Sequence, residues 1–204
     1  MKSMFLANAK QKEKAAALNE IRLLASIRMP NVIGYKCSFY CPEIQSLCIV
    51  MEYADGGDLE SKINTRLEGF GYNGFDEKFI WKCAYQILKG LKGLHDHNII
   101  HRDMKCANIF FADGVAKLGD LNISKITDNG FASTQTGTPY YTSPEIWNGQ
   151  KYSSKCDIWA LGCIIYEMCT LLPPFRAEDF PGLFQTITKG TYEDIPKKYT
   201  KSLR

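Results

Sequence analysis

The stretch CDIWALGCIIYEMCTLL, residues 156–172, constrains the fold of this chain most strongly. It is apolar on nearly every side, and its length suits a helix that is buried in a protein core. Asp157 and Glu167 interrupt the apolar run and exclude a membrane span. The chain has 204 residues and 45% hydrophobic content, which is enough for one sizeable core or two modest ones.

Two other stretches, residues 12–27 and 79–95, have the apolar spacing of amphipathic helices, and residues 179–189 are a further expected helix. Residues 124–149 are polar and show no periodicity. Short runs rich in β-favouring residues predict four strands. The expected strands are residues 32–39, 46–53, 108–112 and 115–120.

The order of these elements divides the chain into two parts. A small strand-bearing part extends to about Tyr53 and precedes a mainly helical part, with residues 54–58 as the joint. A cleft between two lobes is a common place for a ligand, so we expect the functional site there.

Charge and cysteine content narrow the class of protein. The net charge of +3 is mild, and it argues against a nucleic-acid or membrane partner. The eight cysteines form no C-x-x-C pair, which favours reduced, mostly buried thiols in a cytosolic protein. The N-terminal apolar run is too short for a signal peptide, so we expect an intracellular, soluble protein.

The chemistry is concentrated in HRDMKCANIF, residues 101–110, and GDLNISK, residues 119–125. The first follows an expected helix and precedes a strand, and the second ends the next strand. Together with GTPYYTSPE and DIWALGC further along, these motifs resemble the catalytic loop H-R-D-x-K-x-x-N and the metal-binding D-F-G of eukaryotic protein kinases. Their order and placement make coincidence a poor explanation.

The resemblance implies a role for each residue in phosphoryl transfer from ATP, a reaction that needs positioning and charge neutralisation. Asp103 would accept or orient the proton of the substrate hydroxyl, and Lys105 would steady the transferred phosphate. Asn108 and Asp120 would hold two Mg²⁺ ions through oxygen atoms, as a hard cation requires. Taken alone, Asp103 could equally be a turn or helix-capping residue.

The same resemblance indicates the class of substrate. Kinases with lysine two positions after the catalytic aspartate mostly phosphorylate serine and threonine, and Thr138 matches the threonine that shapes their substrate site. A turn threonine before proline is the alternative for Thr138. Leu121 and Asn122 depart from D-F-G. Asparagine tolerates positive φ better than most residues, so we expect Asn122 to be a tolerated change.

The resemblance to kinases also implies a lysine and a glutamate in the small, strand-bearing part. Glu20 lies in the first expected helix, and Lys2 lies eighteen positions earlier. This separation fits a strand end, a loop and two helical turns, so we expect Lys2 to contact ATP and to pair with Glu20. A solvated terminal lysine is the alternative for Lys2.

IVMEYADGGDL resembles the strand and hinge that hold adenine in kinases. Met51 would be the gatekeeper beside the pocket. The backbone of Glu52 and Ala54 would bond to the adenine edge, and Phe110 would pack under its ring.

GFGYNG, residues 69–74, has the G-x-G-x-x-G spacing of phosphate-binding loops. A kinase glycine loop lies between two strands upstream of the ATP lysine, whereas GFGYNG lies between two expected helices. We therefore expect a surface connection rather than a phosphate cradle.

The predicted fold is α+β, a protein-kinase-like two-lobe fold. Residues 1–53 would be the remainder of the small lobe, without the strands of the glycine-rich loop. Residues 54–204 would be a mainly α-helical large lobe that lacks its last helices.

ALNEIRLLASIRMPNVIGY, TQTGTPYYTSPEIW and PPFRAEDFPGL are most similar to the NIMA-related kinases, serine/threonine enzymes associated with mitosis, centrosomes and cilia. This resemblance implies Thr134 as the activating phosphosite, with Arg102 pairing with its phosphate. An ordinary polar loop residue is the alternative for Thr134. Protein substrates with serine or threonine follow as partners, with microtubule, centrosome or ciliary proteins as candidates and a cytoplasmic, centrosome- or cilium-associated location.

Two other functions compete with a serine/threonine kinase using Mg-ATP. One is a truncated, catalytically weak or inactive kinase-like binding module, favoured by the missing glycine loop. The other is a small-molecule kinase, which the long segment between Asp120 and Glu145 disfavours.

Overall fold

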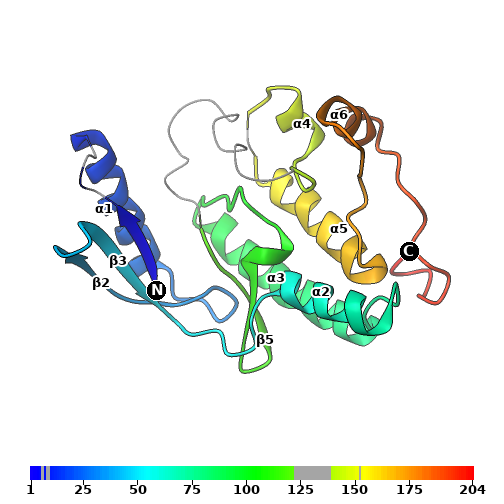
Figure 1. Ribbon diagram of the computed structural model, residues 1–204, viewed down its shortest axis with the longest axis horizontal. Helices are drawn as coiled ribbons and strands as arrows, with labels where there is room; N and C mark the ends of the chain where they lie inside the picture. The colour runs from blue at the N-terminus through cyan, green and yellow to red at the C-terminus, as the bar shows by residue number, and fades with distance from the viewer. Residues whose placement is uncertain (6, 8–9, 122–138, 152) are drawn as a thin grey trace.

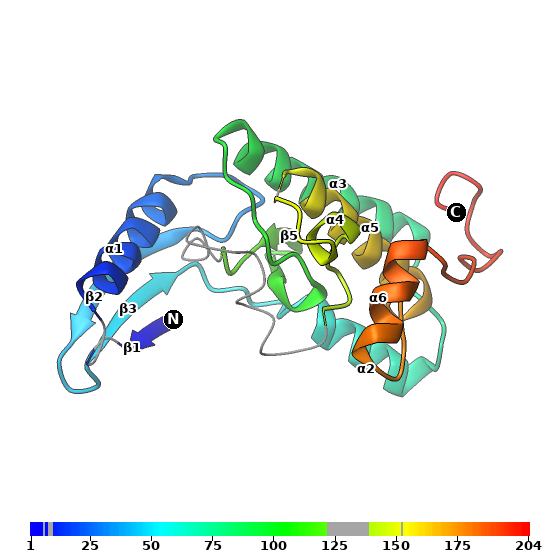
Figure 2. The ribbon, with the colours of Figure 1, turned by 90° about the horizontal axis from the view of Figure 1, so that it is seen from above.

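The computed structural model describes residues 1–204 except residues 6, 8–9, 122–138 and 152. Its elements form two groups (Figures 1 and 2), with a small sheet and helix α1 on one side and the remaining helices on the other. The first group consists of β1 (Lys2–Phe5), α1 (Gln11–Ser26), β2 (Tyr35–Cys41) and β3 (Ser46–Met51).

The small sheet is antiparallel and has the order β1-β3-β2. Strand β3 lies in the centre, where it pairs with both β1 and β2, and its residues Ser46 to Ile49 are buried. The turn that joins β2 to β3 places Tyr40 opposite Leu47 and Cys41 opposite Ser46. The two strands expected over residues 32–39 and 46–53 are therefore present, with β2 shifted toward the C-terminus.

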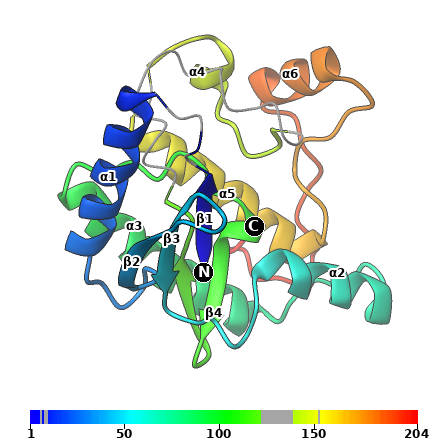
Figure 3. The same ribbon diagram turned by 60° about the vertical axis from the view of Figure 1, so that its left-hand side comes forward.

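The chain passes from β3 into α2 through residues 52–58. The second group is mainly helical and contains one two-stranded antiparallel sheet, β4-β5. Figure 3 shows α1 and α2 on opposite sides of the molecule. The elements of this group are α2 (Leu59–Phe70), α3 (Glu77–Asp96), η1 (Cys106–Asn108), β4 (Ile109–Ala112), β5 (Val115–Leu118), α4 (Pro144–Trp147), α5 (Lys155–Thr170) and α6 (Phe180–Lys189).

Helix α5 is the buried helix predicted from its apolar sequence. Ile164 and Met168 are fully buried, and α5 packs against α3 in the centre of the helical group. Among the described residues, no helix has both the length and the apolar content to cross a bilayer. The cysteines are free thiols, of which Cys37 is exposed, Cys41 is half-buried and the others are buried.

GFGYNG is the end of α2 and the connection to α3, as predicted. Asp76 begins α3 by accepting a hydrogen bond from the Lys78 amide at 3.1 Å. Gly74 is needed for packing, because a side chain there would overlap the carbonyl oxygen of Cys169. The glycine spacing therefore reflects a helix end and a close approach of two backbones.

One hydrophobic core joins the two groups. Leu24 and Ile49 of the small lobe belong to the same buried cluster as Ile87 of α3. Backbone bonds strengthen this contact: the Ile33 amide donates to the Leu118 carbonyl at 2.8 Å, and the Leu118 amide donates to the Asn31 carbonyl at 2.9 Å. The segment after α1 is thus fixed to β5 of the large lobe.

This arrangement confirms the two-lobe α+β fold. In the described part of the chain, no strand precedes β1 and no helix follows α6. The short helix α4 lies within the polar stretch of residues 124–149, which shows no periodicity in the sequence. Pro144 supplies the first turn of this short helix, and Ile146 and Trp147 are buried, a pattern too short to show a period.

Candidate functional site

The loop between α3 and β4 brings three predicted catalytic residues together. The Asn108 side-chain amide donates to the Asp103 carbonyl at 2.7 Å and to Asp103 Oδ2 at 3.1 Å. The Lys105 ammonium lies 3.7 Å from the same Oδ2. Asp103 and Lys105 keep partial exposure, with 26% and 39% of their side chains accessible, so a substrate can reach both.

The pairing of β4 with β5 places Asp120 beside this loop. Ile109 lies opposite Leu118, and the Gly119 amide donates to the Asn108 carbonyl at 3.0 Å. Asn108 therefore precedes one strand, and Asp120 follows its neighbour. The two residues thus lie at adjacent strand ends.

Lys2 reaches this site from the small lobe. Its ammonium lies 2.8 Å from Asp120 Oδ1, although the two residues are 118 positions apart. The side chains are 31% and 39% exposed, so the ion pair borders solvent. Glu20 lies in α1, but its side chain is outside the described part of the chain, so its pairing with Lys2 stays a prediction.

His101 connects the loop to the strand end, a role that the sequence analysis did not assign. Its ring Nε2 bonds to the Gly119 carbonyl at 3.0 Å, and its Nδ1 accepts from the Asp103 amide at 3.4 Å. Burial lowers the pKa of His101. A neutral ring with its proton on Nε2 satisfies both bonds, so His101 positions Asp103 relative to the residue before Asp120.

Asp157 of α5 is a second positioning residue that the sequence analysis missed. Its Oδ2 accepts from the His101 amide at 2.9 Å, and its Oδ1 accepts from the Arg102 amide at 3.0 Å. The ring of His95 bonds to Oδ2 at 2.8 Å. Arg102 has a φ of 67°, which is costly for a residue with a side chain, and Asp157 stabilises this turn directly before Asp103.

Glu167 occupies a corresponding place about three turns further along α5. Its Oε2 accepts from the Tyr141 hydroxyl at 2.6 Å and from the Cys106 thiol at 3.4 Å. Burial raises the pKa of Glu167, and it raises the pKa values of Tyr141 and Cys106 as well. The signal for both acids was visible in the sequence, because each interrupts an otherwise apolar helix.

The predicted adenine-binding residues line the passage from β3 to α2. Met51 ends β3, the Glu52 amide donates to the Gly34 carbonyl at 2.7 Å, and the Ala54 carbonyl accepts from the Gly57 amide at 3.3 Å. These contacts define the backbone of the hinge. That the backbone of Glu52 and Ala54 binds adenine stays a prediction.

The Glu52 side chain ties the hinge to β5. Its Oε1 bonds to the Lys117 ammonium at 2.6 Å, and its Oε2 accepts from the Gly34 amide at 3.0 Å. Burial acts to raise the pKa of Glu52, but the bonds from Lys117 and Gly34 outweigh it, and the pKa is lowered. The carboxylate therefore stays charged and holds the hinge against the large lobe.

Phe110 lies in β4 and is half-buried. Its ring covers Gly119, where an added Cβ would come within 2.5 Å of a ring carbon. Glycine before Asp120 is thus required by this ring. That Phe110 packs under the adenine ring stays a prediction.

Three predicted positions, Asn122, Thr134 and Thr138, lie outside the described residues. In the part of the chain that the structure describes, no group of three or more His, Cys, Asp or Glu side chains could hold a metal ion. A cation site here would therefore depend on the Asp120 carboxylate and the Asn108 amide. The nitrogen of that amide bonds to Asp103, so its oxygen is the atom suited to a cation.

Comparisons with known proteins show what this chain is similar to. Residues 1–202 match the family described as protein kinase domain. The chain is 39% identical over 207 residues to serine/threonine-protein kinase Nek1 of Mus musculus, covering 100% of this chain and 17% of that protein. It is 42% identical over 197 residues to mouse Nek5, covering 95% and 30%, and 40% identical over 200 residues to Nek2 of Homo sapiens, covering 94% and 44%. The chain thus spans less than half the length of each of these relatives.

Proposed function

Because the chain belongs to the protein kinase family, in its NIMA-related branch, we propose that it transfers the γ-phosphate of Mg-ATP to serine and threonine hydroxyls of protein substrates. Protein kinases in general use ATP and a divalent cation. The observation that carries the proposal is the convergence of three parts of the chain: the loop with Asp103 and Asn108, Asp120 after β5, and Lys2 in β1.

Each residue has a chemical task in this proposal. Asp103 orients the attacking hydroxyl and takes its proton as the oxygen bonds to phosphorus and ADP leaves. Lys105 lies beside Asp103 and is suited to hold the transferred phosphate. Lys2 contributes a positive charge for the phosphates of ATP, and its bond to Asp120 places that charge next to the proposed cation ligand.

The donor atoms of the site fit magnesium. Asp120 and Asn108 offer carboxylate and amide oxygens, which Mg²⁺ prefers. When bound, the ion would neutralise charge on the phosphates. His101 and Asp157 act through the backbone of the loop and keep Asp103 and Asp120 at a fixed separation.

The test uses three peptides that differ only in an acceptor serine, threonine or tyrosine, incubated with the complete natural protein and Mg-ATP. We expect labelling of the serine and threonine peptides. Labelling of the tyrosine peptide alone, or of none by a protein with bound Mg-ATP, would contradict the proposal. Asp120→Asn should also reduce the rise in melting temperature that Mg-ATP causes, since a ligand stabilises the state that binds it.

Regulation and location belong to the same proposal. We propose Thr134 as an activating phosphosite and Thr138 as part of the substrate site, on the strength of the motif resemblance. Arg102, directly before Asp103, is half-buried and is the proposed partner of the phosphate. Centrosomal, microtubule or ciliary partners are proposed only from the NIMA-related membership of the chain. A Thr134→Ala variant with unchanged activity would remove Thr134 from this role.

A further inference from the structure

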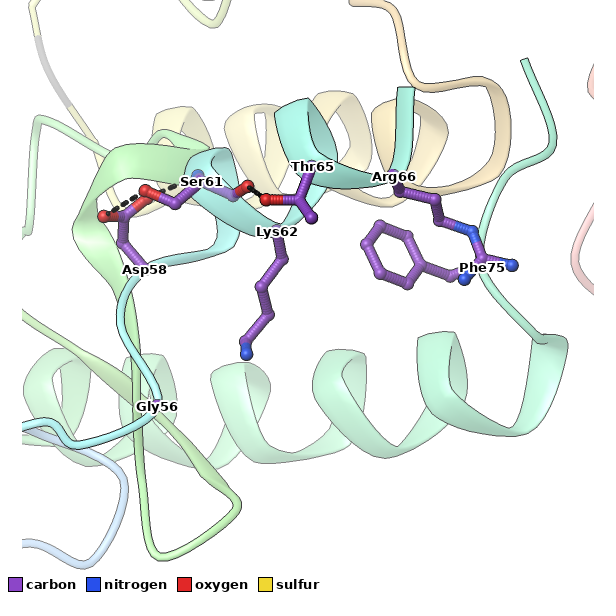
Figure 4. A pocket seen from close by; sticks show the side chains of 7 residues that line it. All are labelled: Gly56, Asp58, Ser61, Lys62, Thr65, Arg66 and Phe75. Atoms are coloured by element: carbon purple, nitrogen blue, oxygen red, sulfur yellow. Dashed lines mark hydrogen bonds between the residues drawn. The ribbon is translucent and has the colours of Figure 1, made fainter. Parts of the chain in front are cut away.

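A hollow on the large lobe is lined by residues other than those proposed for ATP binding and catalysis. It has a volume of about 420 Å³ and lies along α2, beside Phe75 in the connection between α2 and α3. Figure 4 shows side chains from α2 on one side and Phe75 beside them. The residues that line it are Gly56, Asp58, Ser61, Lys62, Thr65, Arg66 and Phe75.

Two cations one turn apart on α2 give the hollow its chemical character. The Lys62 ammonium lies 4.9 Å from the centre of the Phe111 ring, and the Arg66 guanidinium lies 5.1 Å from the centre of the Phe75 ring. Arg66 Nε also donates to the Asn73 carbonyl at 2.8 Å, which fixes the orientation of its planar group. Both cations are therefore held over aromatic surface rather than extended into water.

The acidic residue of the hollow is bonded to a serine of α2. Among the lining residues, Asp58 is the one carboxylate, and it caps α2. Its Oδ1 accepts from the Ser61 amide at 2.7 Å and its Oδ2 from the Ser61 hydroxyl at 2.9 Å. Figure 4 shows Asp58 turned toward Ser61 and Lys62 pointing away from both.

A third cation adds positive charge next to Arg66. Lys198 bonds to the Asn73 side chain and to the Gly74 carbonyl. Burial, and then the charge of Arg66, lower the pKa of Lys198. Cations that repel one another are stabilised by an anion, so this region favours a negatively charged ligand.

We propose that this hollow is a docking site for an acidic, unphosphorylated peptide segment of a protein substrate, with an apolar side chain between its carboxylates. Carboxylates would pair with Lys62 and Arg66, since the guanidinium fork matches the two oxygens of a carboxylate. The apolar side chain would lie against Phe75. That the segment belongs to a substrate rests on the proposed kinase function, whereas its binding in the hollow requires no nucleotide.

A peptide suits this site better than a nucleic acid. A net charge of +3 is too mild for the broad basic surface that nucleic acids require. The exposed Ser61 and Thr65 along the same side of α2 offer hydroxyl oxygens to the backbone amides of an extended segment.

Binding is tested with a fluorescein-labelled, capped peptide Asp-Leu-Asp-Glu-Leu-Asp and its neutral counterpart Asn-Leu-Asn-Gln-Leu-Asn, added to the complete natural protein without ATP. Fluorescence anisotropy should detect the acidic peptide and show weaker binding with added salt. Lys62→Glu and Arg66→Glu should each weaken binding about tenfold or more. Lys62→Met removes the charge but keeps most of the side-chain stem, so it serves as a second variant in case Lys62→Glu does not fold. Lys151→Glu is the matched control, a charge reversal on an exposed lysine outside the hollow.

Equal binding of the neutral peptide would overturn the proposal, and so would unchanged binding by Lys62→Glu and Arg66→Glu. A phosphoserine peptide that binds far more tightly than the acidic one would replace it with phosphate recognition. In a second assay, fusing the acidic segment to a serine peptide should lower KM without changing kcat, and Lys62→Glu should abolish only that gain. Failure of the kinase proposal would remove turnover on all peptides and leave anisotropy unaffected, so the two failures are distinguishable.

Discussion

Replacing Asp157 by alanine should destabilise the protein severely. The change leaves the backbone amides of His101 and Arg102 without their acceptor. A buried donor without a partner costs about 1–3 kcal/mol, so the two amides together cost about 2–6 kcal/mol. The total stability of a domain is about 5–15 kcal/mol, so this loss is large compared with the whole.

Asparagine at this position should have an intermediate effect. Its single oxygen keeps one acceptor, while its NH₂ group would face a second donor. The Asp157→Asn variant should therefore lose about half of what the alanine variant loses. Urea unfolding followed by circular dichroism measures both, provided that the dependence on urea concentration is unchanged.

The matched control is Asp96→Ala. Asp96 forms an exposed pair with Lys92 at 2.8 Å, and such a pair contributes about 0.3–0.5 kcal/mol. If Asp157→Ala unfolded with the same midpoint as the wild-type protein or as Asp96→Ala, the carboxylate would not support the loop, and the account of Arg102 would be wrong.

Three further predictions concern other parts of the structure. Gly74→Ala should destabilise the fold by about 1–3 kcal/mol, because the added methyl group would overlap the backbone of Cys169. Gly69→Ala, in open space within α2, should instead stabilise the fold by up to about 1 kcal/mol. Changes of the same sign for the two variants in urea unfolding would refute this reasoning. The pKa of His101 is lowered in the folded protein, so below pH about 6.5, the pKa of an unfolded histidine, the unfolded chain binds the proton first. The free energy of unfolding should therefore decrease as the pH decreases through this range, and its dependence on pH should be weaker in His101→Gln. An equal pH dependence in the two proteins would contradict this role of His101. Lys2→Met should lower kcat about 10²-fold at unchanged melting temperature, and wild-type kcat in that variant would return Lys2 to the role of a solvated terminal lysine.

The elements that the sequence predicted well are those with long, one-sided or uniform patterns. Residues 79–95 show a clear apolar stripe, and the structure has α3 over Glu77–Asp96. Helix α5 was recognisable because it is apolar all round. By contrast, α4 is only four residues long, so its sequence contains no repeat.

The candidate site was predictable where neighbouring positions in the sequence determine it. Asp103, Lys105 and Asn108 lie within one loop, and their spacing is enough to bring them together. The contact of Lys2 with Asp120 confirms that Lys2 reaches the site, although its pairing with Glu20 stays a prediction.

The supporting contacts depend on distances that no local pattern reveals. Asp157 meets His101 across 56 positions, and Lys117 meets Glu52 across 65 positions. These contacts exist because α5 packs against the loop and β5 packs against the hinge, and tertiary packing of this kind is not visible in a local sequence pattern. An acid in an apolar helix was the available sign for Asp157, and it was used only to exclude a membrane span.

The role of Asp103 in phosphoryl transfer is tested by measuring transfer of labelled γ-phosphate from Mg-ATP to a serine peptide, with the complete natural protein and with its Asp103→Asn variant. We expect turnover by the wild-type protein and a loss of about 10²–10⁴-fold in the variant. Melting temperature and Mg-ATP binding should stay unchanged, because Asp103 is partly exposed and Asn108 can still bond to its backbone carbonyl. Wild-type turnover by Asp103→Asn would show that the reaction does not use this site.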